Sequence, residues 1–128
     1  MLGLREFERL LRVVEELKTR SSCGAVVVVE GRRDVAALRS LGVEGEIIEA
    51  SATPISAVVD AIGGREVIIL TDWDSRGRVM KDRLSSLIRN ANLEIWNELS
   101  SITGRYIHSV EELPGLIETL YGLHRKRM

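Results

Sequence analysis

Apolar residues recur along this chain in two rhythms, one typical of helices and the other of buried strands. Helices are predicted, from apolar side chains spaced three or four residues apart, over 3–20, 33–41, 54–62, 76–90, 93–99 and about 110–123. Strands are predicted, from short and mostly β-branched runs, over 25–30, 46–50 and 66–71, with a weaker fourth at 104–108. The pattern is therefore one helix followed by alternating strands and helices.

Turn and cap residues support several of these boundaries. Gly42 is expected just beyond a helix end, while Thr53 is expected as an N-cap with Pro54 at the first helical position. Residues 109–112 resemble a capping box that opens the last helix. Pro114 is an awkward residue inside that helix and moves its expected start to about residue 113.

Strands that alternate with helices of this length predict an α/β fold. We expect a parallel sheet of about four strands, with helices on both faces and right-handed crossovers. A chain of 128 residues, with 45% hydrophobic residues and both signs of charge, fits one globular domain over 1–128. It carries no repeat or low-complexity tract.

Charge and cysteine content narrow the functional classes. The net charge of −1 argues against a surface that is basic throughout, although it allows a local basic patch. Cys23 is the single cysteine, so a disulfide framework and a multi-cysteine zinc site are excluded, and a buried or half-buried structural thiol is expected. Neither a membrane-spanning apolar run nor a secretory signal pattern is found, and the cytoplasm is the expected location.

Two apolar runs end abruptly in carboxylates. Glu30 closes the run at 26–29, and Asp72 and Asp74 follow the run at 67–71. Ligands of parallel sheets bind beyond the carboxyl ends of the strands, so these three side chains are expected to converge. Converging carboxylates repel one another unless a cation lies between them, and oxygen ligands suit Mg²⁺ or Mn²⁺.

Each of these residues also has a simpler structural interpretation, except Asp72. Glu30 could be an exposed charge at a strand end, whereas Gly31 permits a ligand or the backbone to approach closely. Asp34 is expected to cap the following helix, and Asp74 is itself a good N-cap candidate. Asp72 has no such structural role in the sequence.

The helix predicted over 76–90 begins beside the acidic residues and is rich in basic ones. Arg76, Arg78 and Lys81 are therefore candidates, with Gly31, for binding phosphate oxygens, although a solvated basic face is an equal alternative. Gly77 suggests tight backbone geometry or a nearby ligand. The side chains expected to point inward are Val79, Met80, Leu84, Leu87 and Ile88.

Other motifs are missing from the sequence. Neither a P-loop nor a dinucleotide-binding glycine pattern occurs. His108 and His124 lack metal-ligand spacing and are expected at the surface or at a strand end.

A strand ending in Glu30-Gly31, followed by a strand ending in Asp72-Trp73-Asp74, resembles the Toprim domain. The segments VVVEGRRD and LTDWDSRG are similar to the small stand-alone Toprim proteins of archaea, to ribosomal-RNA maturation nucleases and to bacterial-type primases. The resemblance covers about residues 24–110. It implies a Rossmann-like, three-layer fold with a four-stranded parallel sheet.

The resemblance also implies a function. It implies Mg²⁺ (or Mn²⁺) held by Glu30, Asp72 and Asp74, with Glu30 as general acid or base. The expected activity is phosphodiester chemistry on DNA or RNA, as a nuclease or nucleotidyl transferase, with a protein partner supplying further domains. No tyrosine context of a topoisomerase and no zinc ribbon or helicase region of a full primase is found.

Two alternatives stand beside that expectation. The first is a non-catalytic Toprim module that binds nucleic acid or a protein partner in replication, repair or RNA processing. The second is a receiver domain, which is disfavoured. A receiver needs an acidic pair after its first strand and a lysine after its last, whereas Glu30 is a lone acid and residues 106–108 contain no lysine.

Overall fold

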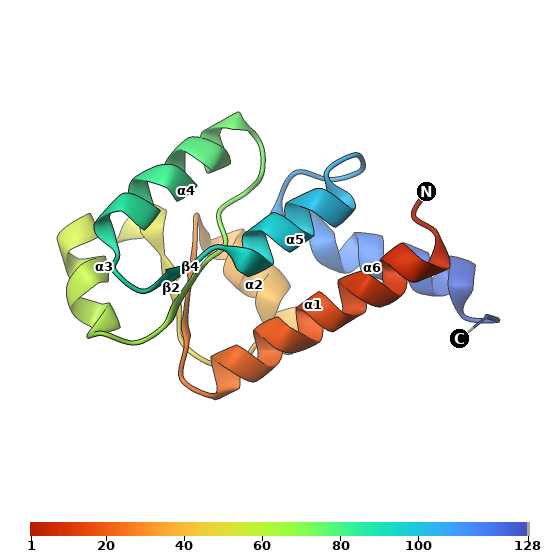
Figure 1. Ribbon diagram of the computed structural model, residues 1–128, viewed down its shortest axis with the longest axis horizontal. Helices are drawn as coiled ribbons and strands as arrows, with labels where there is room; N and C mark the ends of the chain where they lie inside the picture. The colour runs from red at the N-terminus through yellow and green to blue at the C-terminus, as the bar shows by residue number, and fades with distance from the viewer. Residues whose placement is uncertain (128) are drawn as a thin grey trace.

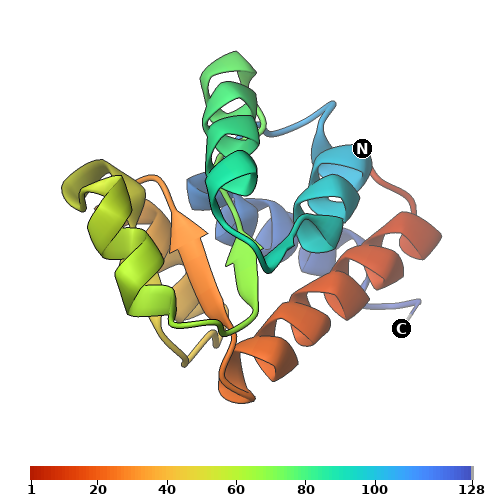
Figure 2. The ribbon, with the colours of Figure 1, turned by 60° about the vertical axis from the view of Figure 1, so that its left-hand side comes forward.

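Four parallel strands form the centre of the structure, a computed structural model that describes residues 1–127. The sheet has the order β2-β1-β3-β4. Its strands are β1 (Val26–Val29), β2 (Ile47–Glu49), β3 (Val67–Ile69) and β4 (Ala91–Asn92). Each neighbouring pair is parallel, and the arrows of β1 and β3 run side by side in Figure 2. The predicted α/β class with a four-stranded parallel sheet is therefore confirmed.

Within residues 1–127, six helices cover the sheet (Figure 1). They are α1 (Leu4–Ser22), α2 (Arg32–Ser40), α3 (Ile55–Ile62), α4 (Ser75–Leu87), α5 (Glu94–Thr103) and α6 (Leu113–His124). Two short 3₁₀ turns, η1 (Ala50–Ala52) and η2 (Val110–Glu112), complete the chain. Within residues 1–127, no helix combines the length and the apolar character needed to cross a membrane.

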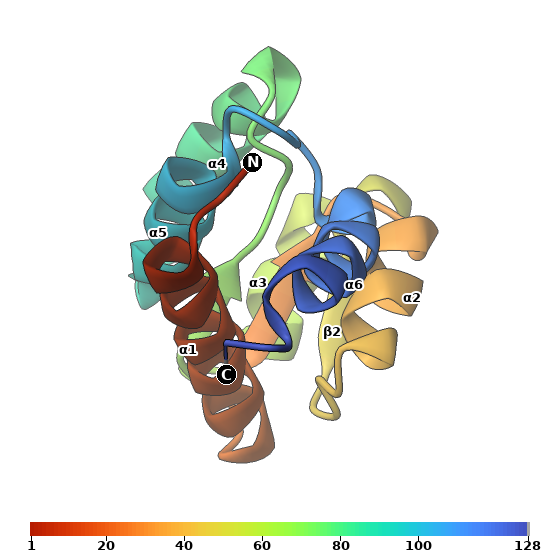
Figure 3. The same ribbon diagram turned by 90° about the vertical axis from the view of Figure 1, so that its right-hand side faces the viewer.

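The strands divide the apolar residues into two cores because alternate strand side chains point to opposite faces of the sheet. Val27 and Val29 of β1 pack with α1, α2, α5 and α6. Val26 and Val28 face the opposite way and pack with α3 and α4. The result is a three-layer arrangement, in which α2 and α6 lie side by side on one face (Figure 3). All four valines of β1 are fully buried, as their continuous apolar run predicts.

The predicted fourth strand at 104–108 is wrong. Residues 104–106 form a turn after α5, in which the Tyr106 amide donates to the Thr103 carbonyl. The fourth strand is instead β4, which pairs its two residues with Val67 and Ile68 of β3. A strand of two half-buried residues, one of them Asn92, has too little apolar pattern to be recognised.

Two predicted helix starts also differ from the structure. Pro54, not Thr53, occupies the N-cap position of α3, and no side chain caps that helix. The capping box expected at 109–112 does not form, because the Glu112 carboxylate accepts the amide of His108 and the segment adopts a 3₁₀ turn. Helix α6 begins at Leu113, as Pro114 predicted.

Three expectations about burial are wrong for physical reasons. Val79 and Leu87 of α4 are 69% and 50% exposed, because α4 rests on the sheet along a narrow face that contains Leu84. Cys23 is exposed beyond the end of α1. His124 is buried, since its ring stacks on Phe7 and its Nε2 lies 2.9 Å from the Leu2 carbonyl.

Two substitutions in α4 test this orientation of the helix. Leu84→Ala should lower the free energy of unfolding by about 2–5 kcal/mol, because it leaves a cavity in the core shared with α3. Val79→Ala, in the same helix, should change it by no more than about 0.5 kcal/mol. Urea unfolding followed by circular dichroism measures both. Equal losses for the two variants would contradict the orientation of α4.

Candidate functional site

The strand order creates a crevice between the carboxyl ends of β1 and β3. From β1 the chain proceeds to β2 on one side of it and later returns to β3 on the other side. In open parallel sheets, ligands bind at the point where the strand order reverses in this way. Glu30 directly follows β1 and Asp72 lies shortly after β3, so both acids lie at this point.

The carboxyl groups of Glu30 and Asp72 are held against each other. The backbone amide of Asp72 donates to Glu30 Oε2 at 2.9 Å. Burial raises the pKa of Asp72 to about 8, with the adjacent Glu30 carboxyl as a further cause, while the hydrogen bond from the Val110 amide acts in the opposite direction. One carboxyl of the pair therefore stays protonated near neutral pH unless a bound cation displaces that proton.

The second partner of Asp72 comes from a segment that is distant in sequence. The amide of Val110 in η2 donates to Asp72 Oδ1 at 3.1 Å. Trp73 fixes this segment in place, because its amide donates to the His108 carbonyl at 2.8 Å and its indole Nε1 to the Ile107 carbonyl at 2.7 Å. The β3–α4 loop and the segment before α6 are thus bonded to each other beside the acids.

Asp74 lines the same cavity, and one of its carboxylate oxygens already has a partner. Its Oδ1 accepts the amide of Gly77 at 2.7 Å and caps α4, as one interpretation of the sequence predicted. No group of three or more acidic, histidine or cysteine side chains within residues 1–127 is arranged to hold a metal ion. The structure therefore brings Glu30 and Asp72 together, while Asp74 lines the same cavity and caps α4 through one of its two oxygens.

A cavity of about 430 Å³ opens above the acid pair. It is lined by Glu30, Gly31, Arg32, Arg33, Asp34, Ser51, Asp72, Asp74, Arg76, Met80 and Glu111. Besides the residues predicted from sequence, the lining includes Arg32 and Arg33. Their position directly after Glu30-Gly31 is the sequence signal that marks them. Arg33 lies 3.8 Å from the Glu111 carboxylate, so one arginine is partly neutralised by the segment before α6.

Gly31 and Asp34 shape the floor of this cavity. Gly31 is the N-cap of α2 with an extended backbone that any residue could adopt, and its amide donates to Asp34 Oδ2 at 3.0 Å. Asp34 is buried, and burial raises its pKa even though it accepts that amide. The predicted capping role of Asp34 is confirmed. A Cβ at position 31 would find only Ser51 within 4 Å, so the glycine leaves open space beside Glu30.

The basic residues predicted on α4 do not all reach the cavity. Arg76 lines it, whereas Arg78 and Lys81 lie over the ring of Trp96, with Lys81 Nζ 4.0 Å from the ring centroid. Trp96 is buried, and its indole Nε1 donates to the Thr71 carbonyl at 2.9 Å. Arg78 and Lys81 therefore pack α4 against α5 through cation–π contacts.

Gly77 allows α4 to start directly beneath the acid loop. A Cβ at this position would overlap the backbone carbonyl of Asp72. Thr71 further fixes the turn, because its hydroxyl donates to the Gly77 carbonyl at 2.8 Å. The tight geometry that the sequence suggested at Gly77 is present.

The donor chemistry of the site fits Mg²⁺ or Mn²⁺. Mg²⁺ in proteins is commonly bound by one or two carboxylates, with waters and substrate phosphates completing its shell. Glu30 and Asp72 provide such a pair, and burial together with the neighbouring Glu30 carboxyl raises the pKa of Asp72. Arg32 and Arg76 on the cavity wall supply positive charge for anionic oxygens.

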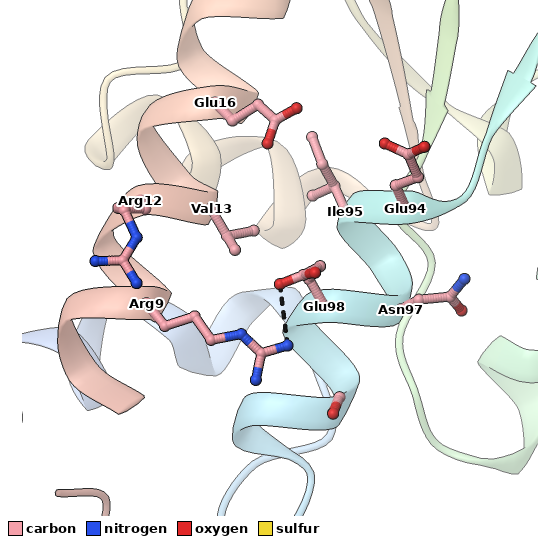
Figure 4. A pocket seen from close by; sticks show the side chains of 9 residues that line it. Arg9, Arg12, Val13, Glu16, Glu94, Ile95, Asn97 and Glu98 are labelled. Atoms are coloured by element: carbon pink, nitrogen blue, oxygen red, sulfur yellow. Dashed lines mark hydrogen bonds and ion pairs between the residues drawn. The ribbon is translucent and has the colours of Figure 1, made fainter. Parts of the chain in front are cut away.

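A larger hollow lies away from the sheet, between α1 and α5 (Figure 4). Its volume is about 640 Å³, and its walls carry both signs of charge, including Arg12 and Glu16. Arg9 and Glu98 across it already form an ion pair at 3.2 Å. It lies away from the reversal of strand order between β1 and β3, so it is the weaker candidate for a chemical site.

Fold and site together define a three-layer α/β protein with an acid pair at the switch point of its sheet. The chain belongs to the UPF0292 family. It is 33% identical to a UPF0292 protein of Archaeoglobus fulgidus over 124 residues, covering 94% of this chain and 98% of that protein. A UPF0292 protein of Methanosarcina barkeri is 37% identical over 115 residues, covering 85% and 80% respectively. These relatives confirm the expected likeness to archaeal proteins.

A solved structure of a protein from Aquifex aeolicus is also similar. It matches with a TM-score of 0.66 and 33% sequence identity, over 80% of this chain and 96% of that one. No family model matches the chain. The comparisons thus support the fold and the family.

The pH dependence of stability tests the environment of Asp72. Its pKa of about 8 in the folded protein exceeds its ordinary value of 3.8, so the folded state binds more protons than the unfolded state in between. The contribution of Asp72 to the free energy of unfolding should therefore be largest below about pH 4. It should fall as the pH rises towards 8. Asp72→Asn should flatten this part of the profile, measured as urea unfolding at several pH values. Asp60→Asn, at an exposed position of α3, should leave the profile as in the wild type.

Gly77→Ala tests the packing beneath the acid loop. The added Cβ must displace the Asp72 backbone, so the free energy of unfolding should fall by more than about 2 kcal/mol. Gly115→Ala is the matched control, because nothing lies within 4 Å of a Cβ there and the exchange in helix α6 should stabilise by up to about 1 kcal/mol. Similar values for both variants would refute the close approach of Gly77 to Asp72.

Proposed function

We propose that this chain is a Toprim-type module that carries out Mg²⁺-dependent phosphodiester chemistry on nucleic acid, as a nuclease or nucleotidyl transferase. The observation that carries the proposal is the Glu30–Asp72 carboxyl pair at the switch point of a parallel sheet, with Arg76 on the same cavity wall. The Glu-Gly and Asp-x-Asp motifs, in this order and at these strand ends, support the same class.

Each residue would have a distinct role. Glu30 and Asp72 would hold the cation, and Asp74 would join them through the oxygen that does not bond Gly77. A bound Mg²⁺ would supply positive charge that neutralises the phosphate during the reaction. Glu30, which has one oxygen engaged by the Asp72 amide, would move a proton with the other. Arg76 and Arg32 would bind and orient phosphate oxygens.

A second candidate is a module that binds nucleic acid or a protein partner without catalysis. The observation in its favour is that Asp74 caps α4 through one oxygen, and that no group of three or more possible metal ligands is found within residues 1–127. A scaffold would not require the third carboxylate. Activity and binding therefore need to be measured separately.

The test is turnover of labelled DNA and RNA oligonucleotides with Mg²⁺, Mn²⁺ or EDTA. The wild type should cleave or extend an oligonucleotide only with a divalent cation. Glu30→Gln should lower the rate by about a hundredfold or more, because it removes both a ligand and a proton carrier. Glu98→Gln, on α5 at the other hollow, should retain the wild-type rate.

Two results would decide against the proposal. Turnover that survives Glu30→Gln would remove Glu30 from the chemistry. Oligonucleotide binding without any turnover, in either metal, would favour the non-catalytic module.

A further inference from the structure

The acidic cavity continues along the outer face of α4. The cavity shares Arg76 and Met80 with a hollow of about 450 Å³ that is also lined by Val79 and Arg83. Met80 and Arg83 in turn border a hollow of about 200 Å³ between α3 and α4. The three hollows therefore adjoin one another across shared side chains, and we call this row of hollows, from Glu30 and Asp72 towards α3, the α4 groove.

The exposed side of α4 along this groove is apolar and basic at once. Arg76, Met80 and Arg83 follow one another at spacings of four and three residues, so they form a single stripe on the helix. Val79 lies beside the stripe. Its side chain is 69% exposed, although it is apolar. The two arginines lie about 10 Å apart along the helix axis, with apolar surface between them.

The charge on this stripe is of one sign. Arg76 and Arg83 are exposed, and within residues 1–127 neither forms an ion pair with an acidic side chain. The acid of α4, Asp82, instead pairs with Lys81 at 3.5 Å, away from the stripe. Two unneutralised guanidinium groups at this spacing match phosphates on successive parts of one backbone.

We infer that the α4 groove binds an unpaired nucleic-acid strand, with its backbone on Arg76 and Arg83 and a base or sugar face on Val79 and Met80. This inference rests on the proposed function, because it places the reacting phosphodiester at Glu30 and Asp72. A duplex would offer phosphates to the two arginines, but its stacked bases would leave the apolar surface between them uncovered. A single strand can turn a base towards that surface, as strand-binding proteins exploit with their stacking platforms.

The experiment measures binding without turnover. Fluorescence anisotropy in EDTA compares a short labelled oligothymidylate and oligouridylate with a blunt duplex of the same length. The wild type should bind the single strands at least about tenfold more tightly than the duplex. Arg83→Gln should weaken single-strand binding about fivefold to tenfold and should reduce the salt dependence by about 0.7 in the logarithmic slope.

Two further variants complete the design. Val79→Asp, at an exposed position where folding is not at risk, should also weaken binding, because it replaces the apolar contact with a negative charge. Arg12→Gln, an exposed arginine in the α1–α5 hollow, should bind as the wild type does. Equal affinity for duplex and single strand, or equal effects of Arg83→Gln and Arg12→Gln, would overturn the inference that the α4 groove binds a single strand.

The outcomes separate this inference from the proposed function. Turnover that depends on Glu30, together with Arg83→Gln binding like the wild type, would refute the groove and leave the function intact. Tight, Arg83-dependent binding of single strands without turnover in any divalent cation would refute the function and leave the groove intact.

Discussion

Two carboxyl groups that would repel each other are held together at the ends of adjacent parallel strands, and the surrounding structure serves to keep them there. The Asp72 amide bonds the Glu30 carboxylate, and the Val110 amide bonds the Asp72 carboxylate. Beneath them, Gly77 lets α4 start against the Asp72 backbone. Each contact removes freedom from Asp72, so the position of this carboxyl is determined from three directions.

This arrangement costs stability in the free protein. Burying a carboxyl next to another one disfavours its charged form, which is why the pKa of Asp72 rises. The hydrophobic layers on both faces of the sheet offset the cost, since the strands that carry the acids are almost wholly enclosed. Sites that oppose the stability of a fold in this way are typical of function and not of packing.

The central strands and the acids at their ends were predictable from sequence because both signals are local. A run such as Val26–Val29 specifies a strand buried on both faces, and the acid that follows must emerge at its carboxyl edge. The capping roles of Asp34, inside the first turn of α2, and of Asp74, at the N-cap of α4, were predictable for the same reason, since each bonds an amide only three residues away.

Features that depend on distant contacts could not be predicted. The hydrogen bond from Val110 to Asp72 joins positions separated by 38 residues, and no local sequence pattern predicts it. Strand β4 exists only through its pairing with β3. The basic residues of α4 were grouped as candidates because they are close in sequence. In a helix, however, side chains two positions apart point to almost opposite faces. Arg76 therefore faces the cavity while Arg78 packs on Trp96.

The link between Val110 and Asp72 has a consequence for the order in which the protein is built. During synthesis, the strands that carry Glu30 and Asp72 leave the ribosome well before the segment that contains Val110. Trp73 and Asp72 therefore lack their partners at 107–110 until that segment has been made. The acid pair acquires its final bonding only after this later segment has been synthesised.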